Sequence, residues 1–346
     1  MYLEFFGLTR HPFLLTPDPG LLFASDGHRR ALAYLEYGLH RSEGFVVITG
    51  EVGAGKTTVV RTMLGTVDPD KVVAVNVVSS QIDGGDLLRY LAQALQVAPG
   101  SDDKSSVLAR IESQLYELHD RGQRALLVID EAQNLSRHAI EELRMLSNFQ
   151  VGPAPLLQVF LVGQPELRAL MESGTMDQVR QRVIASCHLG ALTLPETIAY
   201  IRHRLELSGW NGRPMFQKEV LFRLHDFTAG VPRRINMACD RLLLASFLSR
   251  SDTITLEAAE PVLAEMLGEL GPLASSGQVA PTDPLLRRDA PRSNVVAIDD
   301  GRLLQRIAGL EERIAALASM HQQLVGAVAQ LMGETERPIQ GEVKPT

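Results

Sequence analysis

The stretch GEVGAGKT, residues 50–57, fits the phosphate-binding pattern G-x-x-x-x-G-K-[ST]. An apolar, β-branched run precedes it at residues 45–49 and is typical of a buried strand. The residues that follow, 58–64, can continue as a helix. This strand–loop–helix order is the context that the pattern requires, so it predicts a phosphate site rather than an ordinary glycine-rich turn.

The composition of this loop indicates how phosphates are held. Gly50, Gly53 and Gly55 let the backbone wrap closely around phosphate oxygens, toward which successive N–H groups and a helix N-terminus direct partial positive charge. Lys56 adds a full charge at the β- and γ-phosphates, and the Thr57 hydroxyl can ligate Mg²⁺. The expected phosphate-binding set is Gly50, Glu51, Val52, Gly53, Ala54, Gly55, Lys56, Thr57 and Thr58.

A second apolar run, residues 125–129, ends in the carboxylates Asp130 and Glu131. A carboxylate at a strand's carboxyl end, here Asp130, can reach Mg²⁺ directly or through water. Glu131 is then placed to orient and deprotonate an attacking water. Acidic residues also cap helices, but a pair that follows a phosphate loop favours the catalytic interpretation.

Further polar residues complete the expected site. Gln164 follows the apolar run 156–163 and is expected to position water beside the γ-phosphate, the alternative being a surface turn residue. Arg180 or Arg182 could reach a neighbouring subunit's γ-phosphate as an arginine finger, the alternative being a solvated or ion-paired helix residue. Arg233, at a helix start, could point at the β- and γ-phosphates so that lid closure depends on nucleotide; alternatively it pairs with an acidic neighbour.

Size and composition favour a soluble chain of two or three domains. The 346 residues are 45% hydrophobic and carry a net charge of −7, which provides no general attraction to nucleic acid or anionic membrane. No signal peptide or transmembrane helix is expected. Cys187 and Cys239 are expected to be buried free thiols in a reducing compartment, rather than a disulfide or metal pair.

Patterning along the chain predicts several units. Residues 1–44 form an N-terminal strap and helix, in which Phe5, Phe6 and Phe13 either help wall an adenine pocket or are simply core. From residue 194 onward the pattern becomes helical. The expected divisions are a strap at 1–44, an ATPase core at 45–193, a helical lid at 194–270, a disordered linker at 271–300, a coiled coil at 301–333 and a disordered tail at 334–346.

The coiled coil is predicted from a 4,3 spacing of apolar residues with one polar position, which favours self-association or pairing with a partner helix. An amphipathic helix folded back on the ATPase core is the alternative. The seam consists of Leu303, Ile307, Leu310, Ile314, Leu317, His321, Leu324, Val328 and Leu331.

Several stretches together resemble the ExeA/GspA-type AAA+ ATPases, over roughly residues 1–267. The most similar branch is the ATPase associated with the exosortase (PEP-CTERM) and exopolysaccharide systems. The stretches are YLEFFGLTRHPFLLTPDP, GFVVITGEVGAGKTT, LLVIDEAQNL, VFLVGQPEL, QVRQRV and GVPRRIN. The resemblance implies an α/β fold: a AAA+ P-loop NTPase core with a parallel sheet between helices, an all-helical lid and, in this chain, a C-terminal coiled-coil helix.

The resemblance also implies ATP rather than GTP, and homo-oligomers with the site at subunit interfaces. Carried over by position, the residues are Lys56 and Thr57 in the P-loop (Walker A), Asp130 and Glu131 in Walker B, Gln164 as sensor 1, Arg233 as sensor 2 and Arg182 as the finger.

Secretion-type members of this family continue into a transmembrane helix and a peptidoglycan-binding domain, whereas residues 271–346 are expected to be linker and coiled coil. We therefore expect a cytoplasmic ATPase, peripheral at the inner membrane, that acts on protein partners in an envelope, exopolysaccharide or PEP-CTERM protein-sorting system. The alternatives are a DNA-binding transposition regulator of the TnsC/MuB kind, a type II secretion assembly ATPase and a non-catalytic adaptor.

Overall fold

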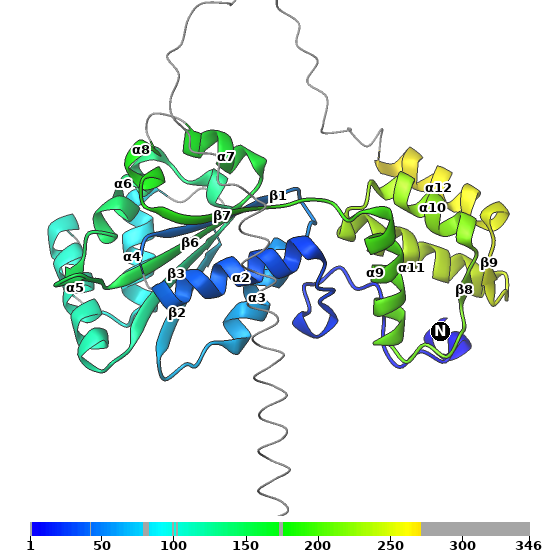
Figure 1. Cartoon of the computed structure of the whole chain (residues 1–346), viewed down its shortest axis with the longest axis horizontal. Helices are drawn as coiled ribbons and strands as arrows, with labels where there is room; N and C mark the ends of the chain where they lie inside the picture. Colours follow the sequence, from blue (N-terminus) through cyan, green and yellow to red (C-terminus); the bar gives the residue numbers. More distant parts are fainter. Residues whose placement is uncertain are drawn as a thin grey trace, which may run out of the picture. The chain divides into compact units, whose positions relative to one another are not determined.

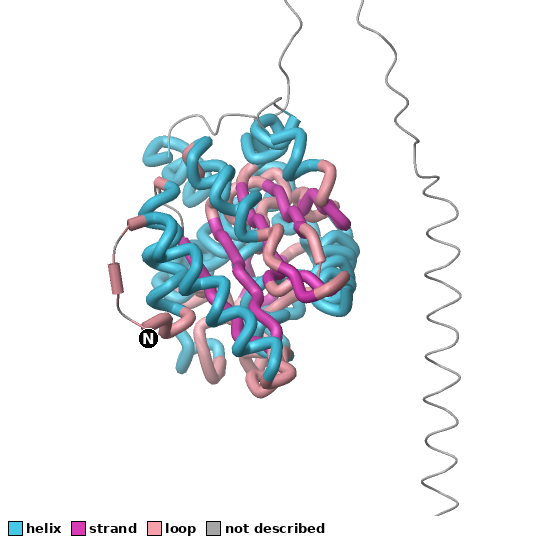
Figure 2. Tube along the Cα trace, turned by 90° about the vertical axis from the view of Figure 1, so that its left-hand side faces the viewer, coloured by secondary structure: helices cyan, strands magenta, loops and turns pink. Residues whose placement is uncertain are grey.

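The computed structural model describes residues 2–41, 43–78, 83–98, 100–101, 103–172 and 176–270. Within them lie a parallel sheet with helices on both faces and a separate cluster of helices, the lid (Figure 1). Figure 2 shows the strands lying among the helices. The linker, coiled coil and tail expected at 271–300, 301–333 and 334–346 lie outside the described residues. The sheet has five strands in the order β2 (Val72–Val78), β3 (Arg124–Asp130), β6 (Leu157–Gly163), β1 (Phe45–Gly50) and β7 (Val183–Leu189).

The strands run parallel, and the three central ones are buried along nearly their whole length. In β1 all six residues are buried: Val46 and Ile48 pack into one hydrophobic cluster, and Phe45 and Val47 pack into another. Strands that are buried on both faces are typical of parallel sheets covered by helices on both sides. Because β1, β3 and β6 are parallel, their carboxyl ends, Gly50, Asp130 and Gly163, meet at one edge of the sheet.

Helices cover both faces of the sheet (Figure 1). On one face pack α2 (Asp26–Arg41), whose first turn is capped by the Ser25 hydroxyl, and α3 (Lys56–Thr66). The other face is covered by α4 (Gly84–Ala94), α5 (Lys104–Asp120), α6 (Arg137–Leu146), α7 (Pro165–Glu172) and the short α8 (Asp177–Arg180). Between β3 and α6 lies the short 3₁₀ turn η2 (Ala132–Asn134), and β4 (Gln150–Val151) pairs with β5 (Ala154–Pro155).

The lid has its own hydrophobic core, which the N-terminal strap completes. Phe6 and Phe13 are buried in that core, and Phe5 is packed against it, so the core alternative proposed for these three aromatics is correct. The lid elements are α9 (Leu194–Glu206), α10 (Lys218–Thr228), α11 (Pro232–Leu248), α12 (Leu256–Leu270) and the pair β8 (Met215–Phe216) with β9 (Thr253–Ile254). In the strap lie α1 (Tyr2–Phe6) and the 3₁₀ turn η1 (Pro19–Leu21).

The edge strand β7 is the main element that the sequence pattern did not predict. Its residues, VIASCHL, include small and polar side chains, and only Cys187 and Leu189 are buried. An edge strand pairs on one side only, here with β1, so it needs no continuous apolar run. Because β7 runs parallel to β1, Arg182, directly before β7, lies at the amino ends of the strands, whereas the phosphate loop lies at their carboxyl ends.

The described part of the chain contains no helix with the length and apolar character needed to cross a bilayer. Cys187 and Cys239 are both buried free thiols. Burial raises the pKa of both thiols, which disfavours the reactive thiolate.

Candidate nucleotide-binding site

The phosphate loop joins β1 to α3 and has a backbone that only glycine adopts freely. Gly53 and Gly55 have positive φ angles of 85° and 101°. If Gly53 carried a Cβ, that atom would lie 2.4 Å from Cβ of Arg233. A Cβ on Gly55 would lie 2.7 Å from Nε2 of His28. The glycines therefore permit both the loop conformation and the close approach of a lid arginine and a buried histidine.

Lys56 is held inside this loop, with only 6% of its surface exposed. Its Nζ donates to the carbonyl oxygens of Gly50 at 2.7 Å and Glu51 at 3.0 Å. Burial lowers the pKa of Lys56, while the nearby charges of Glu131 and Asp130 oppose this shift by favouring the ammonium form. A cation buried at a helix N-terminus suits a polyanionic ligand.

The Thr57 hydroxyl and Asp130 lie next to each other at the loop. Thr57 Oγ1 donates to Asp130 Oδ2 at 2.8 Å, and Asp130 Oδ1 accepts from the Glu131 N–H at 2.9 Å. Hydroxyl and carboxylate oxygens are the donors that Mg²⁺ prefers, and Mg²⁺ is usually held by few protein groups together with phosphates and water. Accordingly, the described residues contain no cluster of three or more His, Cys, Asp or Glu side chains that would hold a metal alone.

Glu131 and Gln164 follow the neighbouring parallel strands β3 and β6, and their side chains are in direct contact. Gln164 Nε2 donates to Glu131 Oε2 at 2.9 Å. Gln133, which the sequence analysis did not include, donates from Nε2 to the same oxygen at 2.6 Å. Burial alone would raise the pKa of the Glu131 carboxyl, but these two hydrogen bonds and the charge of Lys56 together hold it below its usual value.

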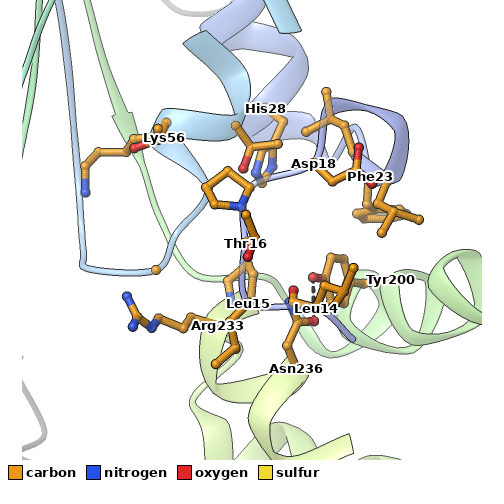
Figure 3. Close-up of a pocket in the computed structure, with 18 of the residues that line it drawn as sticks. Leu14, Leu15, Thr16, Asp18, Phe23, His28, Lys56, Tyr200, Arg233 and Asn236 are labelled. Atoms are coloured by element: carbon orange, nitrogen blue, oxygen red, sulfur yellow. Dashed lines mark hydrogen bonds between the residues drawn. The ribbon is translucent and has the colours of Figure 1, made fainter. Parts of the chain in front are cut away.

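The lid contributes Arg233 to this site. Its backbone N–H, in the first turn of α11, donates to the Gly53 carbonyl at 3.2 Å, and the side chain lines the cavity beside the loop (Figure 3). A cation at this position can contact phosphate oxygens, and it also joins the lid to the phosphate loop.

The cavity beside the loop measures about 190 Å³. On the lid side Tyr200, Arg204 and Asn236 line it, and Tyr200 Oη donates to Asn236 Oδ1 at 2.7 Å (Figure 3). The strap supplies a further wall of the cavity, but Phe5, Phe6 and Phe13 are not among its lining residues. The strap residues that line the cavity are Leu14, Leu15, Thr16, Pro17, Asp18, Leu21, Leu22 and Phe23.

His28 also lines the cavity and was not predicted as a site residue. It is 4% exposed, and its Nδ1 lies 2.5 Å from Ser25 Oγ. Burial lowers the pKa of His28, although a backbone hydrogen bond with Ala54 opposes the shift. The buried imidazole therefore lies against the phosphate loop at Gly55.

Neither candidate finger arginine lines this cavity. Arg182 donates from Nη1 to the carbonyl and hydroxyl oxygens of Ser147, at 3.0 and 2.7 Å, and from Nη2 to Asn148 Oδ1 at 2.5 Å. Arg180 pairs with Asp177 at 2.7 Å, with both side chains about half exposed. Arg182 is thus bound within its own chain, whereas an exposed pair such as Arg180–Asp177 costs little to separate.

Comparison with known families agrees with this geometry. Residues 39–171 match the family described as "AAA domain". The matched range includes the phosphate loop, Asp130, Glu131 and Gln164, and it ends before both finger candidates and the lid.

A curated relative extends beyond the AAA domain. Over 255 residues, 73% of this chain, it is 38% identical to "General secretion pathway protein A" of Aeromonas hydrophila. The match takes up 46% of the relative, so the chain spans about half the length of that protein. This similarity supports the ExeA/GspA-type resemblance.

Solved structures show the same fold at low identity. The ORC2 protein of Aeropyrum pernix, in ADPNP–ADP complexes, aligns with a TM-score of 0.57 at 18% identity, covering 74% of this chain and 71% of that one. Cdc6p from Pyrobaculum aerophilum aligns with a TM-score of 0.53 at 14% identity, covering 72% and 71%. Drosophila ORC bound to DNA aligns with a TM-score of 0.57 at 16% identity, covering 74% of this chain and 64% of that one. The α/β P-loop NTPase fold expected from the sequence is confirmed.

Proposed function

We propose that the protein binds Mg²⁺–ATP at the phosphate loop and hydrolyses it to ADP and phosphate. The observation that carries this proposal is the convergence of Lys56, the Thr57–Asp130 pair and the hydrogen-bonded Glu131 at one edge of the sheet, beside a cavity that Arg233 also lines. These groups supply phosphate binding, metal binding and water activation, the three requirements of phosphoryl transfer to water.

In the reaction, a water oxygen attacks the γ-phosphorus in line, the bond from that phosphorus to the β–γ bridging oxygen breaks, and ADP leaves. Glu131 orients the water and accepts its proton, while Lys56 and Arg233 stabilise charge on the phosphate oxygens. Mg²⁺, held by Thr57 and with Asp130 as its carboxylate partner, would neutralise charge on the β- and γ-phosphates.

The partners are proposed from the relative. A name that refers to a general secretion pathway favours work on protein partners in a secretion or envelope system. The finer assignment, to an exopolysaccharide or PEP-CTERM protein-sorting system, remains our hypothesis and rests on the motif resemblance. On this proposal the protein is a cytoplasmic homo-oligomer that associates with the inner membrane through a partner.

Replacing Lys56 with methionine is expected to weaken ATP binding about thirtyfold, because a charged hydrogen bond contributes about 2 kcal/mol. Isothermal titration with a non-hydrolysable ATP analogue and Mg²⁺ measures the change. Lys71→Met is the matched control, because Lys71 is an exposed lysine that pairs with Asp68 and lies directly before β2, at the amino end of the sheet, away from the phosphate loop. Equal affinities for Lys56→Met and wild type would contradict the assignment of the phosphate site.

The specific ATPase rate is expected to rise with protein concentration if a neighbouring subunit completes the site. Mixing an excess of Arg182→Ala or Arg180→Ala subunits, each carrying an intact Glu131, with wild-type protein would then lower the rate per wild-type site. The mixing assay identifies the finger as the arginine whose loss has this effect. A rate that is independent of concentration and of both variants would contradict a site shared between subunits.

A further inference from the structure

Glu131, the residue directly after β3, has an unusual backbone conformation. Glu131 has a φ of 56°, in the left-handed region that residues other than glycine seldom occupy. This conformation ends β3 and begins the 3₁₀ turn η2, which consists of Ala132, Gln133 and Asn134. The turn carries the Gln133 side chain back to the Glu131 carboxylate.

Both ends of the Gln133 amide are used. Nε2 donates to Glu131 Oε2 at 2.6 Å, and Oε1 accepts the backbone N–H of Gln164 at 2.9 Å. Gln164 Nε2 donates to the same Glu131 oxygen at 2.9 Å. These three hydrogen bonds form a closed ring that joins the end of β3 to the end of β6.

The packing around Gly163, next to this ring, is a second and independent indication that the Gln133 amide belongs in this position. A Cβ added at Gly163, the last residue of β6, would lie 2.7 Å from Gln133 Oε1 and 2.9 Å from Leu167 Cδ2. Real Cβ atoms do not approach other heavy atoms so closely. Glycine at this position therefore leaves the room that the Gln133 amide occupies, and Gln133 is a fitted part of the site rather than a surface side chain.

We propose that Gln133 is a positioning residue for ATP hydrolysis: its amide fixes the Glu131 carboxylate and links it to the strand end that carries Gln164. This inference rests on the proposed ATPase function, which it deepens. Gln133 touches neither ATP nor water in the proposed reaction; it acts through Glu131. A change at Gln164 caused by the γ-phosphate would reach Glu131 both directly and through Gln133, since all three share the ring.

The test replaces Gln133 with leucine or methionine, which keep its approximate size but neither donate nor accept. We expect kcat to fall about tenfold with KM for ATP within about twofold of wild type, because misplacing a catalytic group lowers rate more than binding. Gln93→Leu, at an exposed glutamine on α4, is the matched control.

The outcomes separate this inference from the proposed function. If both Gln133 variants fold as judged by thermal unfolding, and match wild type in kcat while Glu131→Gln is inactive, the inference is wrong and the ATPase assignment stands. If Glu131→Gln retains full turnover, the catalytic assignment fails, and the positioning role fails with it. A lower kcat with unchanged KM, in variants that fold like the wild type, supports the role of Gln133.

Discussion

Replacing Glu131 with glutamine is expected to lower kcat for ATP hydrolysis by about 10²- to 10⁴-fold, the usual contribution of a positioned general base. The amide cannot accept a proton from water. Its oxygen can still accept the hydrogen bonds that Gln133 and Gln164 donate to Oε2 in the wild type, so we expect the fold and ATP binding to survive. Steady-state turnover, with affinity for ATP measured by titration, tests both parts.

Glu117→Gln is the matched control for this variant. Glu117 is exposed on α5 and pairs with Arg121, and the same change of carboxylate to amide there should leave turnover unaltered. If Glu131→Gln turns over ATP as fast as the control, Glu131 is not the catalytic base. Loss of binding together with turnover would indicate a structural role instead.

Replacing Arg204 with methionine is expected to destabilise the strap and lid by about 3 kcal/mol. Arg204 on α9 is only 5% exposed and donates to three strap carbonyls: from Nε to Pro12 at 2.6 Å, from Nη2 to Leu14 at 3.1 Å and from Nη1 to Leu21 at 3.4 Å. Methionine keeps the apolar stem but leaves the Pro12 and Leu21 carbonyls without this donor, at about 1–3 kcal/mol for each that stays buried, while the Leu14 carbonyl keeps its hydrogen bond from Asn236 Nδ2.

Arg202→Met provides a control on the same helix. Arg202 is exposed and pairs with Glu206, an arrangement that contributes at most about 1 kcal/mol. We expect the Arg204 variant to unfold at lower temperature than the Arg202 variant, to expose the strap to proteolysis first, and to bind ATP more weakly because the strap walls the cavity. Identical unfolding of the two variants would show that Arg204 does not hold the strap.

Local patterns in the sequence were sufficient to predict the phosphate-binding side of the site. The phosphate loop at residues 50–57 can be recognised from the sequence because its chemistry depends on adjacent residues. The apolar runs that lead to Asp130 and Gln164 can likewise be recognised as strands without knowledge of their neighbours. Parallel pairing then requires that the strand ends lie together, and the contacts Thr57–Asp130 and Glu131–Gln164 agree with this expectation. The roles of these residues, and those of Arg233, Arg182 and Arg180, remain predictions.

Other parts of the site depend on contacts between distant segments, which leave no local pattern. Arg202 and Arg204 have equivalent chemistry in the sequence, yet only Arg204 is buried against a strap about 190 residues earlier in the chain. In the sequence, Gln133 is one of several polar residues after Glu131 and has no distinguishing feature. In the folded chain, the backbone conformation of Glu131 places Gln133 beside Gln164. The edge strand β7 is recognisable only by its pairing with β1.

The sequence by itself determined the fold class and the chemistry of the phosphate loop, because both follow from short-range periodicity and from neighbouring residues. Tertiary structure alone decided which side chains hold Glu131, and which ones fasten the strap over the cavity. The physical reason is that burial and hydrogen-bond partners belong to pairs of segments, so they exist only after the strands, lid and strap have packed together.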